Sequence, residues 1–233
     1  MRRALLALIL LVTLAVAVAW WLRGPTETPT PGPAAGESPR LAGPLPPVVT
    51  PGDPEPLRAP SFAQAELKEI ADEGRRERFT ERRYDPPYAL PVLIRRPSDG
   101  WLTSPEALLA AATSATAAAD FDWWFSLWDP NAQKEKLAML AEGGHDRSVF
   151  VDGWKREYAG RKQVLIRRID LPGYAIVYLR REGESDESPE AKTPLAMKPD
   201  AQGRWWLTHD LTDNPVYFYD SMREDADVRT IRE

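Results

Sequence analysis

The sequence has no cysteine and only two histidines among its 233 residues. A chain without thiols cannot form a disulfide scaffold, a thiol nucleophile or an iron–sulfur cluster. With only His145 and His209, a metal site built from three histidines of one chain is excluded, and we expect neither a metal nor a cofactor. The chain carries 30 basic and 35 acidic side chains, a net charge of −5. A nucleic-acid-binding protein usually has a basic excess, so we expect no nucleic-acid partner.

Residues 4–22 form a hydrophobic run in which Thr13 is the only polar residue. A helix of this length spans about 28 Å at the usual rise per residue, which matches the hydrocarbon core of a bilayer. Trp20 and Trp21 stand at the end of the run, and aromatic rings favour the membrane–water interface. The pattern predicts a membrane anchor over residues 1–23.

A cleaved signal peptide is the alternative, because Ala15-Val16-Ala17 and Ala17-Val18-Ala19 both have the form of a cleavage site. Cleavage would remove residues 1–19, secrete the chain and leave a tryptophan-rich new terminus, so we favour the anchor. Arg2 and Arg3 precede the run and are expected on the cytoplasmic side by the positive-inside rule. The bulk of the chain is therefore expected outside the cytoplasm.

Residues 24–60 are rich in proline and show no periodic hydrophobic pattern. Proline fixes φ and removes a hydrogen-bond donor, so neither a helix nor a sheet can propagate through such a segment. A chain of this composition behaves as a semi-rigid extended spacer. We expect residues 24–60 to be a disordered linker that acts as a tether.

After the linker, the first pattern is helical. Ser61 and Gln64 have the spacing of a capping box, which predicts a helix that starts at Ser61 and ends near Phe79. A short strand is expected after it, at a sheet edge, because Pro91 would interrupt an interior strand. Residues 61–100 are therefore expected to form a helical extension and a short strand.

Residues 101–219 contain helical patterns followed by strand patterns. The strongest helix start is Ser104-Pro105-Glu106, with an N-cap, a proline at the first helical position and an acid near the positive end of the dipole. Aromatic residues then recur at helical spacing, first as Phe121, Trp124, Phe125 and Trp128 and later as Phe150, Trp154 and Tyr158. Strands are expected after Gly160, over residues 163–171, 174–181, 193–198 and 204–212.

This order predicts an α+β domain in which N-terminal helices pack on a curved, mostly antiparallel sheet, preceded by a transmembrane helix and a proline-rich linker. A charged tail is expected over residues 220–233. Both faces of the strand at residues 174–181 are apolar, so both need cover. The helices can cover one face. The other needs the helix from Ser61, a second subunit or another protein, which predicts a protein partner or a homo-oligomer through the outer sheet face.

The pattern and order resemble the nuclear-transport-factor-2-like family, which has a cone-shaped α+β fold. The residues that carry the resemblance are the helix start at residues 104–106, Ala119-Asp120-Phe121-Asp122-Trp123, Trp154-x-x-x-Tyr158-x-Gly160 and Gln202-Gly203-Arg204-Trp205-Trp206-Leu207. The resemblance covers roughly residues 100–219 and implies a pocket between helices and sheet. The family includes enzymes, transport factors and non-catalytic envelope components, so its fold leaves the function open.

His209 is the one candidate catalytic residue. Alternation along residues 204–212 places His209 on the same face as Trp205, Leu207 and Leu211, directed toward the aromatic helices. A histidine there could act as a general base, or it could be a core histidine that donates one ring N–H to a carbonyl. We favour the structural interpretation, because no matching catalytic tyrosine and aspartate pair is found.

Candidate ligand-lining residues are the aromatic and basic side chains expected near the pocket, namely Trp124, Trp128, Trp154, Tyr158, Arg167 and Trp205. The tryptophans could stack on a sugar or a lipid, or simply pack the core. Arg167 is in phase with Leu165 and Ile169, and could bind an anionic ligand or pair with Asp120 or Asp122; we favour the ion pair.

Together these patterns predict a membrane-tethered domain outside the cytoplasm that binds a partner protein or a small ligand without catalysing a reaction. The alternative is a small pocket enzyme of the lyase, isomerase or cyclase type that uses His209 as general base.

Overall fold

The computed structural model describes residues 53–72, 75–158, 160–188, 190–217 and 227–231. The predicted membrane anchor and most of the predicted linker lie outside these residues. Within them, no helix is both long enough and apolar enough to cross a bilayer.

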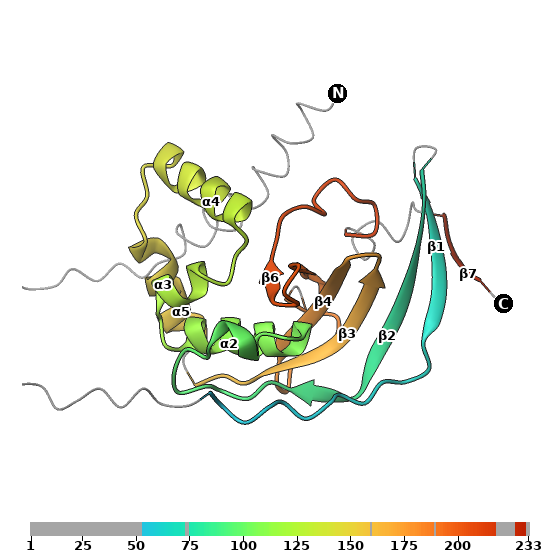
Figure 1. The fold of residues 1–233 in the computed structure, drawn as a ribbon, viewed down its shortest axis with the longest axis horizontal. Helices are drawn as coiled ribbons and strands as arrows, with labels where there is room; N and C mark the ends of the chain where they lie inside the picture. The colour runs from blue at the N-terminus through green and yellow to red at the C-terminus, as the bar shows by residue number, and fades with distance from the viewer. Residues whose placement is uncertain (1–52, 73–74, 159, 189, 218–226, 232–233) are drawn as a thin grey trace, which may run out of the picture. The chain divides into compact units, whose positions relative to one another are not determined.

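The described strands form one antiparallel sheet in the order β6-β5-β4-β3-β2-β1-β7 (Figure 1). The strands are β1 (Glu66–Asp72), β2 (Arg75–Ala89), β3 (Gln163–Leu171), β4 (Tyr174–Arg181), β5 (Pro194–Pro199), β6 (Trp205–Leu207) and β7 (Asp227–Thr230). All neighbouring pairs run antiparallel. Five of the pairs join strands that follow one another in the sequence, with the helices between β2 and β3, whereas the sixth joins β7 to β1. The α+β class is thereby confirmed.

Four α-helices of the described chain lie between β2 and β3. They are α2 (Pro105–Ala117), α3 (Phe121–Phe125), α4 (Pro130–Glu142) and α5 (Ser148–Glu157), and short 3-10 turns occur at η1 (Asp99–Trp101) and η2 (Glu190–Lys192). The predicted start of the first helix is confirmed, since Ser104 accepts from the N–H of Ala107 and Pro105 is the first helical residue. Helix α2 lies across one face of the sheet and buries Leu108 and Leu109 completely (Figure 1).

The opposite face of the sheet has its own core. Ile70, Phe79, Ile169 and Ile176 are buried there, on four adjacent strands. Residues beyond β6 supply cover for it, because Leu211 and Val216 are buried in the same cluster. Part of the cover that we expected from a helix or from another subunit therefore comes from the C-terminal part of the chain, and an oligomer remains a prediction.

The prediction of a helix from Ser61 to about Phe79 was wrong. These residues enter a β-hairpin, in which β1 pairs with β2 from Glu66↔Glu81 to Asp72↔Arg75. The acidic and basic side chains that are good helix formers instead pair across the two strands. Arg78, for example, donates to Glu69 at 3.1 Å. Tertiary pairing overrides helix propensity here, because β2 also pairs with β3 and so lies inside the sheet.

The position of β2 corrects a second expectation. Of the edge strand expected over residues 88–95, only Tyr88 and Ala89 are in a strand, at the end of the interior strand β2, where Tyr88 pairs with Leu165 of β3. Residues 90–95 form no strand. Pro91 lies beyond the last strand residue, so it interrupts no ladder.

Both ends of the described chain are more ordered than the sequence predicts. The last residues of the expected linker contact the domain: Ser98 donates twice to Asp53, at 2.6 Å each, and the indole of Trp101 donates to the carbonyl of Pro54. In the expected charged tail, β7 pairs with β1, with Ile70 opposite Val228.

The last predicted strand, over residues 204–212, is much shorter than expected. Only Trp205–Leu207 form β6. Leu207 packs in the core under α2, whereas Leu211 packs in the core on the opposite face. The predicted alternation therefore ends at Leu207, because the chain leaves the strand and crosses from one face of the sheet to the other.

Candidate functional site

An aromatic cluster joins helices α3 and α5. Asp120 caps α3 by accepting from the N–H of Trp123 at 2.9 Å. The ring of Phe121 stacks on Trp154 of α5, and Trp124 meets the same indole edge-on at a centroid distance of 5.1 Å. Trp124 also meets Trp128 edge-on at 5.4 Å. The tryptophans predicted from helical spacing therefore form one continuous row of rings.

The segment between α3 and α4 is joined to β6 by backbone hydrogen bonds. The N–H of Leu207 donates to the carbonyl of Leu127, and the N–H of Asp129 donates to the carbonyl of Leu207, both at 2.9 Å. Trp128 and Leu207 thereby form a parallel bridge. This connection brings His209, two residues after Leu207, beside the end of the tryptophan row.

Helix α4 begins at this connection. Asp129 is its N-cap, and its Oδ1 accepts from the N–H groups of Asn131 and Ala132 at 2.8 and 3.1 Å. The buried residues of α4 are Ala132, Lys136 and Leu140, which recur every four positions and so share one face. A lysine therefore occupies the middle of the buried stripe, where an aliphatic residue would be usual.

The amine of Lys136 lies over the tryptophan row. Its Nζ is 3.5 Å from the centroid of the Trp128 ring and 5.2 Å from that of Trp124, which is the geometry of a cation–π contact. The residue is only 9% exposed. Burial outweighs the nearby charge of Glu135 and lowers the pKa of Lys136 to about 8.

His209 joins Lys136 to a carboxylate. The Nε2 atom of His209 lies 3.2 Å from Lys136 Nζ, and its Nδ1 lies 2.9 Å from Glu135 Oε2. An ammonium can only donate, so Nε2 accepts from Lys136 and Nδ1 carries the proton that is donated to Glu135. The imidazole meets Trp128 edge-on at 4.9 Å. The candidate site is this Glu135–His209–Lys136 chain against Trp124 and Trp128.

A pocket of about 370 Å³ lies at the N-terminal end of α4. It is lined by Asp129, Pro130, Asn131, Lys198, Pro199, Asp200 and Trp206. Lys198 Nζ lies 3.5 Å from Asp129 and 2.6 Å from Asp210. Burial alone would raise the pKa of Asp129, but hydrogen bonds from Thr208 and from the helical N–H groups outweigh it and lower that pKa. Lys198 is thus paired with two carboxylates, and Asp200 accepts from the indole of Trp206 at 2.9 Å.

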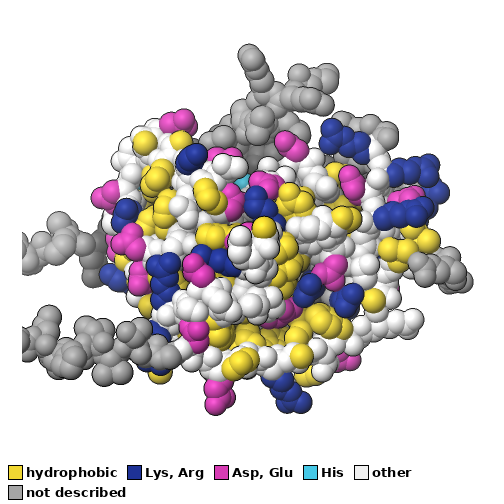
Figure 2. All heavy atoms as spheres, in the orientation of Figure 1, with side chains coloured by type: hydrophobic (Ala, Val, Ile, Leu, Met, Phe, Trp, Pro, Cys, Tyr) yellow, Lys and Arg dark blue, Asp and Glu magenta, His cyan; other side chains and the backbone are white. Residues whose placement is uncertain are grey.

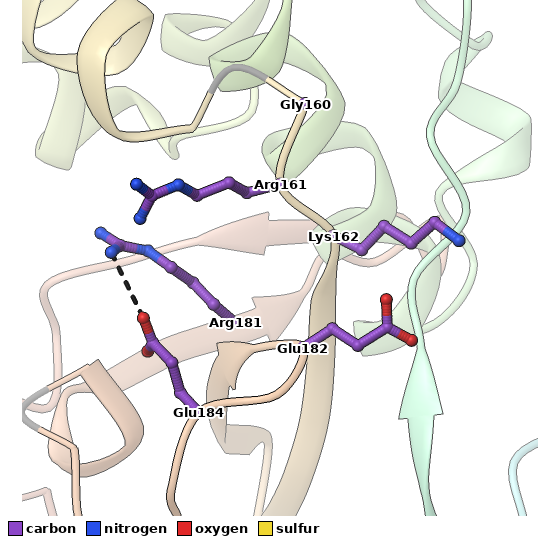
Figure 3. Close-up of a pocket in the computed structure, with 6 residues that line it drawn as sticks. All are labelled: Gly160, Arg161, Lys162, Arg181, Glu182 and Glu184. Atoms are coloured by element: carbon purple, nitrogen blue, oxygen red, sulfur yellow. Dashed lines mark hydrogen bonds and ion pairs between the residues drawn. The ribbon is translucent and has the colours of Figure 1, made fainter.

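A second pocket, of about 420 Å³, lies where β3 begins and β4 ends. Figure 3 shows the guanidinium groups of Arg161 and Arg181 side by side, with Glu184 accepting from Arg181 at 3.3 Å. Arg181 also pairs with Glu157 at 3.5 Å. The lining residues are all charged except Gly160, whereas pockets for small molecules are mostly apolar.

The structure brings six of the predicted site residues into two adjoining hydrophobic clusters and places only Arg167 apart from them. His209, Trp124, Trp128 and Trp154 form one row of rings. Tyr158 lies at the end of α5, with Arg181 over its ring at 5.7 Å. Trp205 packs against the core under α2, and Arg167 lies on the other face of the sheet.

The ion pair expected for Arg167 forms with another partner. Arg167 lies 3.8 Å from Glu81 of β2 and stacks at 3.8 Å on the ring of Tyr178. Asp120 and Asp122 are not its partners, because a register shift between Leu165 and Arg167 turns Arg167 to the face of Tyr178. Lys68 donates to the same Glu81 at 2.8 Å, so these three charged side chains are buried together.

A further buried acid was not predicted. Glu106, at the second position of α2, accepts from the hydroxyl of Tyr84 at 2.7 Å and from Arg168 at 3.1 Å. Arg168 also donates to Asp170 at 2.6 Å. Burial, with the neighbouring charge of Glu106, raises the pKa of Tyr84, so this phenol stays protonated and serves as a donor that joins β2 to α2.

The sequence analysis did not identify Lys136 or Glu135. The spacing of Ala132, Lys136 and Leu140 behind the Asp129-Pro130 helix start is a signal that could have placed Lys136 on the buried face. Nothing local indicates that His209 would meet it, because the two are 73 residues apart.

In the described part of the chain, no three Asp, Glu or His side chains are grouped so as to hold a metal ion. Comparison with known proteins found no matching family model, no matching curated protein and no matching solved structure. The resemblance to the nuclear-transport-factor-2-like family therefore stays a prediction.

Proposed function

We propose that this protein is a membrane-tethered domain outside the cytoplasm that binds a partner protein and does not catalyse a reaction. The tether is predicted from residues 4–22 and the proline-rich linker. The observation that argues against catalysis is that both ring nitrogens of His209 already have partners within the chain.

A general base needs a lone pair that faces the substrate. The lone pair of His209 Nε2 accepts from Lys136, and Nδ1 holds the proton shared with Glu135. The space beside Trp128, where a ligand would stack, holds the side chain of Lys136. Trp124, Trp128 and His209 thus hold the α3–α4 region together with Lys136.

The outer faces of α4 and α5 are the proposed contact surface. Among the described residues, large exposed hydrophobic side chains fall in two groups, and one consists of Leu137 and Met139 on α4 and Val149 on α5. Leu137 and Met139 flank the buried stripe of α4 on its two sides, about 200° apart around the helix, and both are exposed. Figure 2 shows hydrophobic, basic and acidic side chains interspersed over the visible face of the molecule.

Site-specific crosslinking in the producing cells tests this function. The chain has no cysteine, so Leu137→Cys carries a single photocrosslinker on the full-length protein. We expect one discrete protein adduct at Leu137, absent when the label is at the exposed Arg83 of β2. Equal labelling from both positions, or none from either, would contradict the proposal.

A pocket enzyme is the second candidate, and the lowered pKa of Lys136 favours it. An amine that is partly neutral near pH 8, beside a histidine and a carboxylate, could act as a base or form a Schiff base with a carbonyl. Incubation with pyruvate and cyanoborohydride, followed by peptide mass spectrometry, should then modify Lys136 far more than the exposed Lys155. Equal modification of the two lysines would exclude this role.

A further inference from the structure

The second group of exposed hydrophobic side chains lies on the segment between β2 and η1. Ile94 is fully exposed and Val92 is 61% exposed, and Arg95 and Arg96 follow them directly. We propose that this segment, residues 91–96, docks onto the anionic surface of the bilayer to which the chain is tethered. The inference rests on the tether in the proposed function and adds a second membrane contact to it.

The segment is held in place so that its hydrophobic side chains point outward. Leu90 and Leu93 are buried in the core under α2. The N–H of Leu90 donates to the carbonyl of Gln163, and the N–H of Leu93 donates to Ser114 Oγ at 2.7 Å. With Leu93 fixed inward, Val92 and Ile94 on either side of it are directed to solvent. Val92 and Ile94 are therefore exposed because Leu90 and Leu93 are fixed in the core.

The preceding part of the chain arrives at this same segment. Asp53 accepts both hydrogen bonds from Ser98, and residues 53–60 run beside the segment that follows β2 (Figure 1). The 30 residues between the hydrophobic run and Asp53 reach at most about 90 Å when extended. A short tether of this kind gives an effective concentration of about millimolar at its target, so a weak contact is enough.

The chemistry of the segment fits lipid better than protein. Stable protein–protein interfaces bury roughly 800 Å² on each partner, far more than two aliphatic side chains offer. A bilayer surface, by contrast, accepts single apolar side chains, and the arginines next to them are attracted to anionic headgroups in the leaflet that they face. Asp53 lies near Arg95, and Asp99 pairs with Arg204, so Arg96 is the arginine best placed for a headgroup phosphate.

Depth-dependent quenching tests the proposal on the full-length chain. Ile94→Cys carries a fluorophore in nanodiscs whose lipid tails bear a quencher, and Val149→Cys on α5 is the matched control. We expect loss of fluorescence at position 94 and none at position 149 when phosphatidylserine is present. The loss of fluorescence at position 94 should be smaller in nanodiscs of phosphatidylcholine alone, and smaller when Arg96→Gln is added.

A third label separates this proposal from the tether itself. Trp20→Cys should be quenched in both kinds of nanodisc if residues 4–22 span the bilayer. Quenching at 20 without quenching at 94 would overturn the docking and leave the tether intact, whereas no quenching at 20 would remove the tether. Quenching at 94 that appears equally at 149 would show non-specific contact and overturn the docking.

Discussion

The amine of Lys136 lies over the indole of Trp128. Lys136 shares the buried face of α4 with Ala132 and Leu140. The hydrocarbon stem of a lysine can pack like an aliphatic chain while its charged end finds a polar or aromatic partner. Here the partner is an indole together with the accepting nitrogen of His209. One residue thereby both fills the core and fixes α4 to the segment after β6.

Shortening this side chain should destabilise the domain more than removing its charge. Lys136→Ala leaves a gap beside Trp124 and Trp128, for which large-to-small core changes cost roughly 2–5 kcal/mol. Lys136→Met keeps the volume and loses the cation–π contact, which is worth about 0.5–2 kcal/mol, while relieving the cost of burying a charge. Urea unfolding followed by tryptophan fluorescence measures both free energies. Equal losses of unfolding free energy in the two variants would show that the charge of Lys136, and not its packing, determines its contribution to stability.

The stability contributed by position 136 should rise with pH between about 8 and 10. The folded-state pKa of Lys136 is lowered to about 8, below its ordinary value of 10.5, so the unfolded chain binds more protons in this window. The free energy of unfolding of the wild type should therefore increase relative to Lys136→Met as pH rises from 8 to 10. The exposed Lys155→Met is the control and should show no such trend. A difference that stays flat would show that the pKa is not lowered.

Asp129 should stabilise α4 in two separable ways. Asp129→Ala removes the cap on Asn131 and Ala132, and N-cap loss costs about 0.5–2 kcal/mol. Asp129→Asn keeps a capping oxygen but removes the charge near Lys198, so it should cost less. Because the folded-state pKa of Asp129 is lowered, the charge contribution is present above its unfolded value near 3.8 and is lost as pH falls below it. Chemical unfolding at pH 7 and at pH 3 measures the change in unfolding free energy on acidification. This change should be smaller for Asp129→Asn than for the wild type.

Removing the acid between two buried cations should be the most damaging of these changes. Glu81→Gln leaves Lys68 and Arg167 on the second sheet face without their shared carboxylate, and breaking a buried ion pair costs about 3–5 kcal/mol. Glu77→Gln, on the same strand, is the control and should lie within about 0.5 kcal/mol of wild type, as surface changes usually do. Thermal unfolding compares the two. Similar melting temperatures for both variants would contradict a structural role for Glu81.

The features predicted correctly from the sequence are those set by local chemistry. Ser104 and Pro105 start α2, and turns at Pro172-Gly173 and before Trp205 separate strands near their predicted places. The hairpin of β1 and β2 could not be found in this way. Its Glu, Lys and Arg residues favour a helix locally, and only the distant β3 makes β2 a strand.

The same limit applies to the sheet faces that were predicted for the site residues. Alternation predicted the face of Arg167 from Leu165, and the face of His209 from Leu207. A register shift after Leu165 and the end of β6 at Leu207 interrupt the two alternating patterns on which these predictions relied. His209 still meets Trp128, but through the bridge between the α3–α4 segment and β6. Such interruptions depend on packing between remote segments, which periodicity does not report.

The pairing of β7 with β1 covers a strand edge that could otherwise pair with other molecules. β1 is a seven-residue strand, and an unpaired strand edge of this kind is a template for pairing with other molecules. Residues 227–230 occupy that edge from Lys68 to Ala71. Loss of residues 227–230 would expose the edge of β1, so β7 protects the sheet against aggregation.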